Sequence, residues 1–245
     1  MAKRAGIHIG TSGWHYPHWS GPFYPEDLRK SAFLTYYAGR FHTVEVNNTF
    51  YRLPSKKALA EWRTSVQPGF VFAVKGSRYI THMKKLNDPR GPVEQFLERI
   101  SILQDTLGPI LFQLPPSWHF NGERLKGFLQ VLPQGYRFAI EFRDPSWFRE
   151  EVYEAIRRRE VAFCIYELGG RHSPREVTTD FVYIRLHGPG RAYQGQYPSQ
   201  VLADWAGALS TWSAQEKEIF CYFDNDEAGC AAQDAARLQD MLLKE

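Results

Sequence analysis

The sequence predicts an α/β protein of the (β/α)8 TIM-barrel type, formed by a single domain over residues 1–245. Three observations lead to this prediction. Short runs rich in β-branched and aromatic residues recur along the chain and alternate with segments of helical periodicity. The runs begin about 30 residues apart, which is the length of a strand–helix unit. Eight such units need about 250 residues, and the chain has 245.

Eight runs are predicted strands because they are short, apolar and bounded by turn-forming residues. In order they are Ile7–Gly13, Thr43–Asn48, Phe70–Ser77, Pro109–Leu114, Arg137–Arg143, Val161–Glu167, Phe181–His187 and Ile219–Asn225. Neither a G-x-G-x-x-G sequence nor a Walker loop follows the first run, which disfavours an open, doubly wound sheet.

Seven segments between the strands have helical patterns. They are Asp27–Gly39, Ser55–Val66, Val93–Leu107, Gly122–Leu132, Trp147–Arg159, Ser199–Trp212 and Ala228–Leu243. Residues 168–180 contain two Gly and one Pro. We therefore expect a missing or short helix between the sixth and seventh strands.

The composition excludes several classes of protein. Apolar residues make up 43% of the chain, which is enough for a large core and argues against disorder. The net charge of +3 is too small to argue for nucleic acid by itself. The three cysteines are too few for a disulfide framework, no apolar leader core follows Met1–Arg4, and no stretch is long enough to span a membrane. We expect a cytoplasmic protein with no membrane partner.

Alternation along the strands predicts where a site lies, since the inward face of a barrel strand becomes polar near its C-terminal end. In the second strand Val44 and Val46 share one face and Glu45 lies on the other. The same rule selects Glu45, Lys75, Gln113, Glu141, Arg143, Arg185, His187 and, less clearly, Asp224. In the sixth strand either Cys164 and Tyr166 or Phe163, Ile165 and Glu167 face inward. The charged residues form either a ligand site or an internal ion-pair network. Burial of many charges has a large cost, which favours the ligand site.

Several motifs in this order resemble the YecE-like family, catalogued as domain of unknown function 72. They are Gly10-Thr-Ser-Gly-Trp14, Val44-Glu-Val-Asn-Asn-Thr-Phe-Tyr-Arg52, Val74-Lys75 with Ile80-Thr-His82, Leu111-Phe-Gln-Leu-Pro-Pro116, Glu141-Phe-Arg143 with Ser146-Trp147, Arg185-Leu-His-Gly188 and Tyr222-Phe-Asp-Asn-Asp226. The resemblance covers nearly the whole chain and implies a TIM barrel but no particular reaction. Asp224 replaces the first Asn of the family's Tyr-Phe-Asn-Asn-Asp pattern, so we expect no essential acid role for it. Cys230 stands where the family often has His, which weakens a metal role there.

The converging residues suggest acid/base chemistry on an anionic substrate. Glu45 and Glu141 are the predicted acid/base pair, and His187 is a further catalytic candidate. Lys75, Arg78, Arg143 and Arg185 are predicted to bind the anionic group. The other predicted substrate contacts are Ser12, Trp14, Asn47, Tyr51, His82, Gln113, Trp147 and Asn225.

Two further features have open interpretations. The loop from His187 to Gly195 is either a phosphate-binding loop or an ordinary mobile lid. Aromatic residues expected in loops either stack on a ligand or pack onto the barrel. They are Trp14, Tyr16, Trp19, Phe50, Tyr51, Trp118, Trp147 and Tyr193.

The sequence favours a hydrolase or isomerase for a small anionic substrate that contains a sugar or phosphate. We expect no cofactor. Glu45, Glu141 and His187 could hold a metal, but the nearby cations would repel it. One alternative is a nucleic-acid protein in which Arg52, Lys75, Arg78 and Lys84 hold phosphates. The other is a non-enzymatic sensor of an anionic metabolite.

Overall fold

The structure is a computed structural model that describes residues 6–243. Residues 1–5 and 244–245 lie outside the described part. The prediction about a leader at Met1–Arg4 and the two ends of the predicted domain therefore lie outside the described residues. Within the described residues, every helix is too short or too polar to cross a membrane.

All eight predicted strands are present. They are β1 (Ile7–Thr11), β2 (Thr43–Val46), β3 (Val71–Lys75), β4 (Leu107–Gln113), β5 (Phe138–Glu141), β6 (Val161–Leu168), β8 (Phe181–Leu186) and β9 (Glu218–Phe223). Their order is β1-β9-β8-β6-β5-β4-β3-β2. Parallel strands that alternate with helices in this order confirm the predicted (β/α)8 TIM-type fold.

The seven predicted helices are also present. They are α1 (Phe33–Ala38), α3 (Lys56–Thr64), α4 (Arg90–Ile100), α5 (Gly122–Val131), α6 (Glu150–Arg157), α7 (Ser199–Ala214) and α8 (Cys230–Leu243). α4 ends before its predicted limit of Leu107, because a 3-10 segment follows in which Gln104 has a φ of 50°. α6 begins after Trp147 because Pro145–Trp147 forms a 3-10 turn that the Asp144 side chain caps.

Three other boundaries or elements differ from the sequence prediction. α1 begins at Phe33, after a 3-10 turn at Lys30–Ala32, and not at Asp27. The second strand ends at Val46, because Asn48–Tyr51 forms the short helix α2. A π-helix at Tyr79–Met83 was not predicted, since five residues are too few to show a helical period.

The segment between β6 and β8 contains no α-helix, as predicted. It holds the two-residue strand β7 (Arg171–His172), which pairs antiparallel with the end of β6. Gly169 and Gly170 form the turn and both have positive φ angles, which glycine adopts without a steric penalty.

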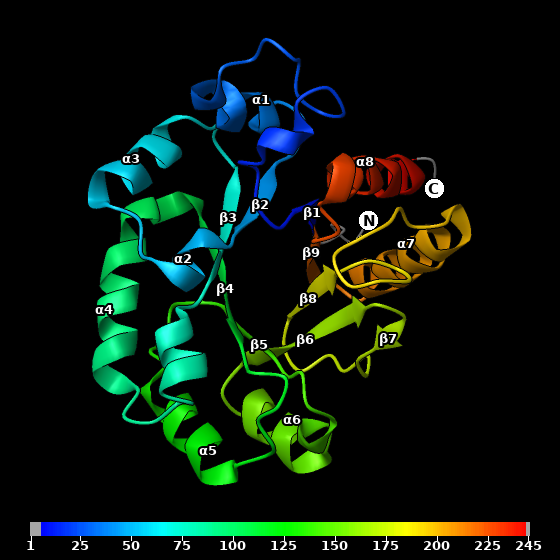
Figure 1. Ribbon diagram of the computed structural model, residues 1–245. Coiled ribbons are helices and arrows are strands. Elements are labelled where there is room, and N and C mark those ends of the chain that lie inside the picture. The colour runs from blue at the N-terminus through cyan, green and yellow to red at the C-terminus, as the bar shows by residue number, and fades with distance from the viewer. Residues whose placement is uncertain (1–5, 244–245) are drawn as a thin grey trace. The chain divides into compact units, whose positions relative to one another are not determined.

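The chain forms two compact units. Unit 1 comprises Met1–Glu45, Ile165–Arg175 and Asp180–Glu245, and unit 2 comprises Val46–Cys164 and Glu176–Thr179. The single domain over residues 1–245 stays a prediction. In unit 1, β1 pairs with β9 and β9 with β8, both in parallel. Figure 1 shows α7 and α8 side by side against these strands.

In unit 1, a side chain joins β1 to β2. The Tyr37 hydroxyl accepts a hydrogen bond from the Thr11 N–H (2.9 Å) and donates to the Thr43 carbonyl (3.1 Å). A Cβ at Gly10 would lie 2.2 Å from that Thr43 oxygen, so only glycine allows the strands to approach this closely. Beyond β1, an isolated parallel bridge links Ser12 to Glu45.

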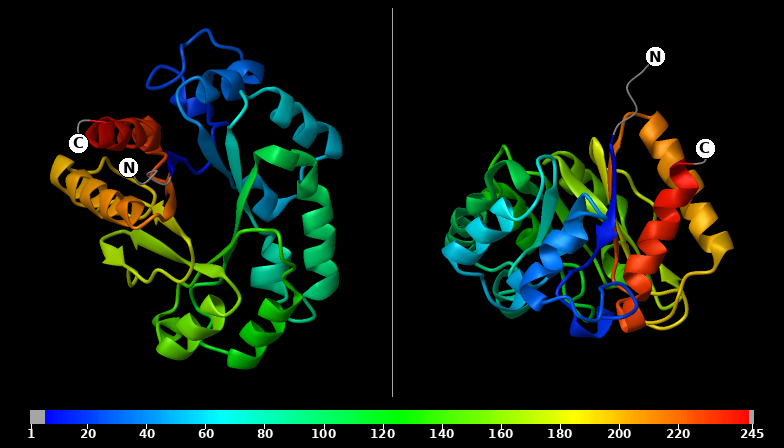
Figure 2. Two further views of the ribbon diagram at one scale, coloured as in Figure 1. Left: turned by 180° about the vertical axis from the view of Figure 1, so that it is seen from behind. Right: turned by 90° about the horizontal axis from the view of Figure 1, so that it is seen from above.

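Unit 2 contains β3, β4, β5 and the start of β6, paired in parallel. The left view of Figure 2 shows α4 and α5, both green, beside each other. The ring of Phe112 in β4 contacts Phe96 of α4 (6.2 Å) and Phe128 of α5 (4.9 Å), which places the core of unit 2 between strands and helices. Phe163 of β6 likewise contacts Tyr153 of α6 (5.5 Å) and therefore faces the helices.

Candidate functional site

Arg185 is the centre of a buried polar cluster in unit 1. Its Nε and Nη2 donate to Glu45 Oε1 at 3.1 and 2.8 Å, and its Nη2 also lies 3.1 Å from Asp224 Oδ2. Arg185 lies near the end of β8, Glu45 in β2, and Asp224 directly after β9. Arg185 and Glu45 lie in the C-terminal halves of their strands and Asp224 just beyond the C-terminal end of its strand, where TIM-type folds place functional side chains.

Glu45 accepts hydrogen bonds on both carboxylate oxygens. The Ser12 hydroxyl donates to Oε1 (2.6 Å) and the Tyr183 hydroxyl donates to Oε2 (2.7 Å). Burial is the main cause of the raised pKa of Tyr183, and the negative charge of Glu45 adds to it, so the phenol keeps its proton and acts as a donor. Glu45 is therefore held as a carboxylate among donors.

His187 contacts two of the three charged residues described above, Asp224 and Arg185. Its Nδ1 lies 2.8 Å from Asp224 Oδ2, and its Nε2 lies 3.3 Å from Arg185 Nη1. A guanidinium can only donate hydrogen bonds, so Nε2 must be the acceptor and Nδ1 must carry the hydrogen. The arrangement therefore fixes one tautomer of a neutral imidazole, with Nδ1–H directed at Asp224. We call Ser12, Glu45, Arg185, His187 and Asp224 the unit 1 cluster.

Two tyrosines border the unit 1 cluster. The Tyr16 hydroxyl donates to the Ser12 carbonyl (2.6 Å). Its pKa is raised, first by burial and then by the charges of Asp224, Asp226 and Glu45. The ring of Tyr193 meets the ring of His187 edge-on at 5.5 Å, and the Tyr193 N–H donates to the His187 carbonyl. The loop between β8 and α7 thus lies directly against His187.

Asn225 and Trp14 hold neighbouring loops in unit 1. Asn225 is buried, and its Nδ2 donates to the Gly195 carbonyl and to Asp234 Oδ2, both at 2.8 Å. Among the described residues, its Oδ1 has no hydrogen-bond partner. Trp14 is also buried, and its carbonyl accepts from the Tyr24 hydroxyl.

Unit 2 contains a second pair of charged residues. Arg143 Nε donates to Glu141 Oε1, and both side chains are almost completely buried. Cys164 Sγ lies 3.7 Å from Glu141 Oε2, which decides the orientation of β6 left open by the sequence. Gln113 is the register partner of Glu141 on the adjacent strand. The Glu141 carboxylate therefore has an arginine and a thiol within reach.

Lys75 and His82 in unit 2 lie on the same aromatic ring. Lys75 Nζ is 4.6 Å from the centre of the Phe50 ring, and the His82 ring meets Phe50 edge-on at 4.9 Å. Burial lowers the pKa of His82 to about 4, and the charges of Lys75, Arg78 and Arg143 contribute. His82 is therefore neutral at physiological pH.

The other predicted contacts in unit 2 have different surroundings. Tyr51 is exposed, and Arg78 Cζ lies 6.0 Å from its ring centre. Asn47 precedes α2, and among the described residues its buried Oδ1 has no hydrogen-bond partner. Trp147 is fully buried, stacks on Phe142 at 5.1 Å and donates to the Trp118 carbonyl, as part of an aromatic core.

Tyr183, which donates to Glu45, was not predicted from the sequence, although it has the same strand face as Arg185 and alternation could have included it. Asp224 was predicted less clearly than the others and without an essential acid role, and its carboxylate bonds to both Arg185 and His187. A single site formed by all the predicted residues stays a prediction. Within residues 6–243, no group of three or more His, Cys, Asp or Glu could hold a metal ion.

Comparison with known proteins identifies the family. The family model described as "Protein of unknown function DUF72" matches residues 8–245. The chain belongs to the DUF72 family. The resemblance found in the sequence is thereby confirmed.

Two curated relatives of this DUF72 chain carry UPF0759 names. UPF0759 protein YecE of Escherichia coli K12 is 32% identical over 157 residues, which cover 62% of this chain and 54% of YecE. The chain thus matches about half the length of that relative. UPF0759 protein YunF of Bacillus subtilis is 24% identical over 269 residues, which cover 96% of this chain and 94% of YunF.

Solved structures of DUF72 proteins share the fold. A DUF72 protein from Thermotoga maritima has a TM-score of 0.88 and 32% identity, and the match covers 98% of this chain and 100% of that one. A DUF72 protein from Enterococcus faecalis has a TM-score of 0.81 and 21% identity, and the match covers 97% of this chain and 95% of the Enterococcus chain. A "methyltransferase from Methanosarcina mazei" is similar in fold alone, with a TM-score of 0.53 and 9% identity over 100% of this chain and 94% of its own.

Proposed function

We propose that this DUF72 protein is an acid/base enzyme, a hydrolase or isomerase, that acts on a small anionic substrate such as a sugar phosphate. The observation that carries the proposal is the buried His187, whose Nδ1–H is held by Asp224 at 2.8 Å. An imidazole fixed in one tautomer by a carboxylate is a common proton-transfer group in enzymes. The proposed reaction uses no metal and no cofactor.

The charge balance of the unit 1 cluster supports this proposal. Two carboxylates, Glu45 and Asp224, face one guanidinium, Arg185. With a neutral His187 the cluster carries one excess negative charge, and a proton on His187 would cancel it. Buried ion networks contribute little to stability compared with apolar side chains of similar volume, so a catalytic use explains this one better than a structural use.

The contacts suggest a separate role for each side chain. His187 Nε2 is the proposed base and acid once the anionic substrate takes the place of His187 as acceptor for Arg185 Nη1, which lies 3.3 Å from Nε2. Asp224 orients the ring and stabilises its protonated form. Glu45 is already engaged by Ser12, Tyr183 and Arg185, so we assign it the positioning of Arg185 rather than proton transfer. The acid/base role expected of Glu141, which belongs to unit 2, stays a prediction.

The loop from Gly188 to Gly195 is the proposed binding element for the anionic group. Loops after the seventh and eighth strands of TIM-type folds often bind phosphate. Gly188 has a φ of 111°, and a Cβ there would lie 2.5 Å from the Arg191 carbonyl, so the tight turn requires glycine. The turn presents the exposed Arg191 in a loop whose Tyr193 touches His187.

The test is a survey of sugar phosphates with the purified protein in heavy water. An isomerase would exchange a carbon-bound hydrogen with deuterium, seen by proton NMR, and a hydrolase would release inorganic phosphate. We expect His187→Gln to lower the turnover rate about 100-fold or more, because the substitution removes the general base. His119→Gln is the matched control, because His119 also lies beside an aspartate (Asp144, 3.3 Å) but is exposed.

Two results would contradict the proposal. Turnover retained by His187→Gln would remove the assigned base. Binding of sugar phosphates without any turnover by the wild type would favour a non-enzymatic metabolite sensor.

A further inference from the structure

Positive charge is concentrated in one segment of unit 2. Residues 46–87 contain eight lysines and arginines but only one acid, Glu61, a net charge of +7. The whole chain has a net charge of only +3. The segment runs from the end of β2 through α2, α3 and β3 to the π-helix. Such local segregation of charge indicates a polyanionic partner better than the overall charge does.

The same segment exposes large apolar side chains. Exposed fractions are 72% for Tyr51, 45% for Tyr79 and 65% for Met83. Each tyrosine has a cation beside its ring: Arg78 Cζ lies 6.0 Å from the centre of Tyr51, and Lys84 Nζ lies 6.0 Å from that of Tyr79. Exposed rings grouped with cations are typical of a binding surface rather than of ordinary solvated helices.

Contacts beneath these exposed side chains hold α2 and the π-helix together. Phe50 of α2 packs edge-on against His82 of the π-helix, and Arg78 at the start of the π-helix reaches Tyr51 at the end of α2. π-helices are rare and often occur at functional sites. The low pKa of His82, due to burial and then to Lys75, Arg78 and Arg143, is consistent with a positive potential at this place.

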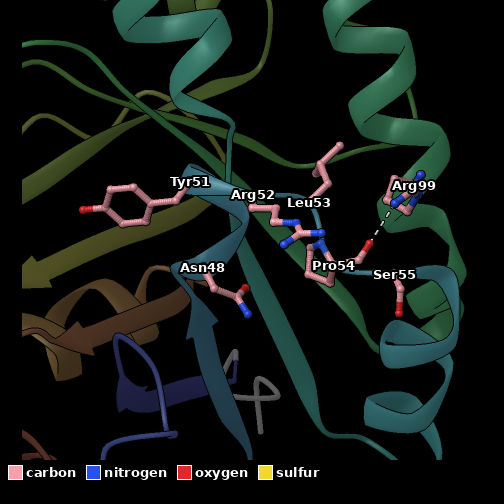
Figure 3. Close-up of a pocket in the computed structure, with 7 residues that line it drawn as sticks. All are labelled: Asn48, Tyr51, Arg52, Leu53, Pro54, Ser55 and Arg99. Carbon is pink, nitrogen blue, oxygen red and sulfur yellow. Dashed lines mark hydrogen bonds between the residues drawn. The ribbon is translucent and has the colours of Figure 1, made fainter.

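A pocket adjoins the exposed tyrosine. It has a volume of about 540 Å³ and is lined by Asn48, Tyr51, Arg52, Leu53, Pro54, Ser55 and Arg99. Figure 3 shows Arg52 and Arg99 on either side of Pro54, with the Tyr51 ring directed away from them. Arg99 donates to the Pro54 carbonyl at 2.8 Å, which fixes this wall. The lining contains two guanidinium groups and no acid, so it suits a phosphate group.

We propose that Tyr51, Arg52, Arg78, Tyr79 and Lys84 form a surface that binds single-stranded nucleic acid. Bases stack on the two tyrosines, and Arg52, Arg78 and Lys84 bind phosphates. A single strand offers flat rings and phosphates in alternation, whereas a duplex hides its base faces and an acidic peptide lacks regular rings. These residues are all distinct from the unit 1 cluster, so this proposal does not depend on the proposed enzyme function.

The test measures fluorescence anisotropy of labelled oligonucleotides with the full chain. The probes are deoxythymidine and uridine oligomers of about 12 nucleotides and a duplex of equal length, at about 50 and about 200 mM salt. We expect both single strands to bind better than the duplex. Tyr51→Leu should weaken binding about 5-fold or more, whereas Tyr51→Phe, which keeps the ring, should bind like the wild type.

Charge is tested separately from stacking. Arg78→Ala should weaken binding and reduce the slope of log affinity against log salt by about 1. Arg157→Ala removes a half-exposed arginine from α6 and should leave binding unchanged. All variants should keep the thermal midpoint of the wild type, since the altered tyrosine and arginine are exposed.

Any of three results would overturn the proposal. The first is no binding of either single strand at the lower salt concentration. The second is preference for the duplex, which would show a response to charge alone. The third is an equal loss of binding in Arg157→Ala and Arg78→Ala.

Discussion

His187 donates its Nδ1 hydrogen to Asp224 across 2.8 Å, because Arg185 faces the other ring nitrogen with a donor. An asparagine at residue 224 would offer an amide oxygen that could accept the same hydrogen. The orientation of the imidazole therefore needs an acceptor at residue 224 rather than a charge.

The first prediction follows from this relationship. Asp224→Asn should retain the Nδ1–H tautomer but lose the charge that stabilises the protonated ring, so turnover should fall about 10-fold or more, whereas Asp224→Leu should lose the tautomer as well and about 100-fold or more. Nitrogen-15 NMR of the His187 ring reports the tautomer without a substrate. A ring that keeps its tautomer in Asp224→Leu would show that Asp224 does not orient it.

The second prediction concerns the buried ion pair of Glu45 and Arg185. Glu45→Leu leaves the Ser12 and Tyr183 hydroxyls and one side of Arg185 without their acceptor. We expect the free energy of unfolding in urea to fall by about 3 kcal/mol. Tyr183→Phe removes one hydrogen bond only and should cost about 1 kcal/mol. Equal stability of wild type and Glu45→Leu would contradict the geometry of this cluster.

The third prediction compares two glycines. Gly10→Ala places a Cβ 2.2 Å from the Thr43 carbonyl oxygen, so β1 and β2 must separate, and we expect a loss of at least about 2 kcal/mol. Gly127 lies inside α5, where a Cβ meets no atom within 4 Å. Gly127→Ala should therefore raise the free energy of unfolding by about 0.5–1 kcal/mol. Thermal unfolding of the two variants should thus shift in opposite directions.

The fourth prediction concerns pH. The pKa of His82 is lowered from 6.5 to about 4, by burial first and then by Lys75, Arg78 and Arg143. Below pH 6.5 the unfolded chain takes up a proton at His82 that the folded chain does not take up until about pH 4. The contribution of neutral His82 to the free energy of unfolding is therefore fully present above pH 6.5, and it is lost as the pH falls from 6.5 to about 4.

The comparison with His82→Gln isolates this effect. The stability advantage of the wild type over the variant should shrink steadily in urea unfolding between about pH 7 and about pH 4. Parallel pH curves for the two proteins would refute the assignment.

The local sequence was sufficient to predict the strands and most helices. Runs such as Phe181–His187 are apolar on one face and bounded by turn residues, so both the existence and the facing of β8 follow from alternation. Boundaries failed where a local side chain decided the end of a helix, as Asp144 does by capping the turn before α6. α2 and the π-helix were missed because they are too short for a period to appear.

The sequence by itself determined the fold class, the interior position of Glu45, Arg185 and His187, and the excess of positive charge in residues 46–87. These properties depend on periodicity and composition, which are local. Only the tertiary structure decided that Asp224 joins the unit 1 cluster and that Cys164 rather than Phe163 lies beside Glu141. It also decided which nitrogen of His187 carries hydrogen. The reason is physical: hydrogen-bond partners come from strands far apart in the sequence, and a tautomer depends on the donors and acceptors that folding places within about 3 Å.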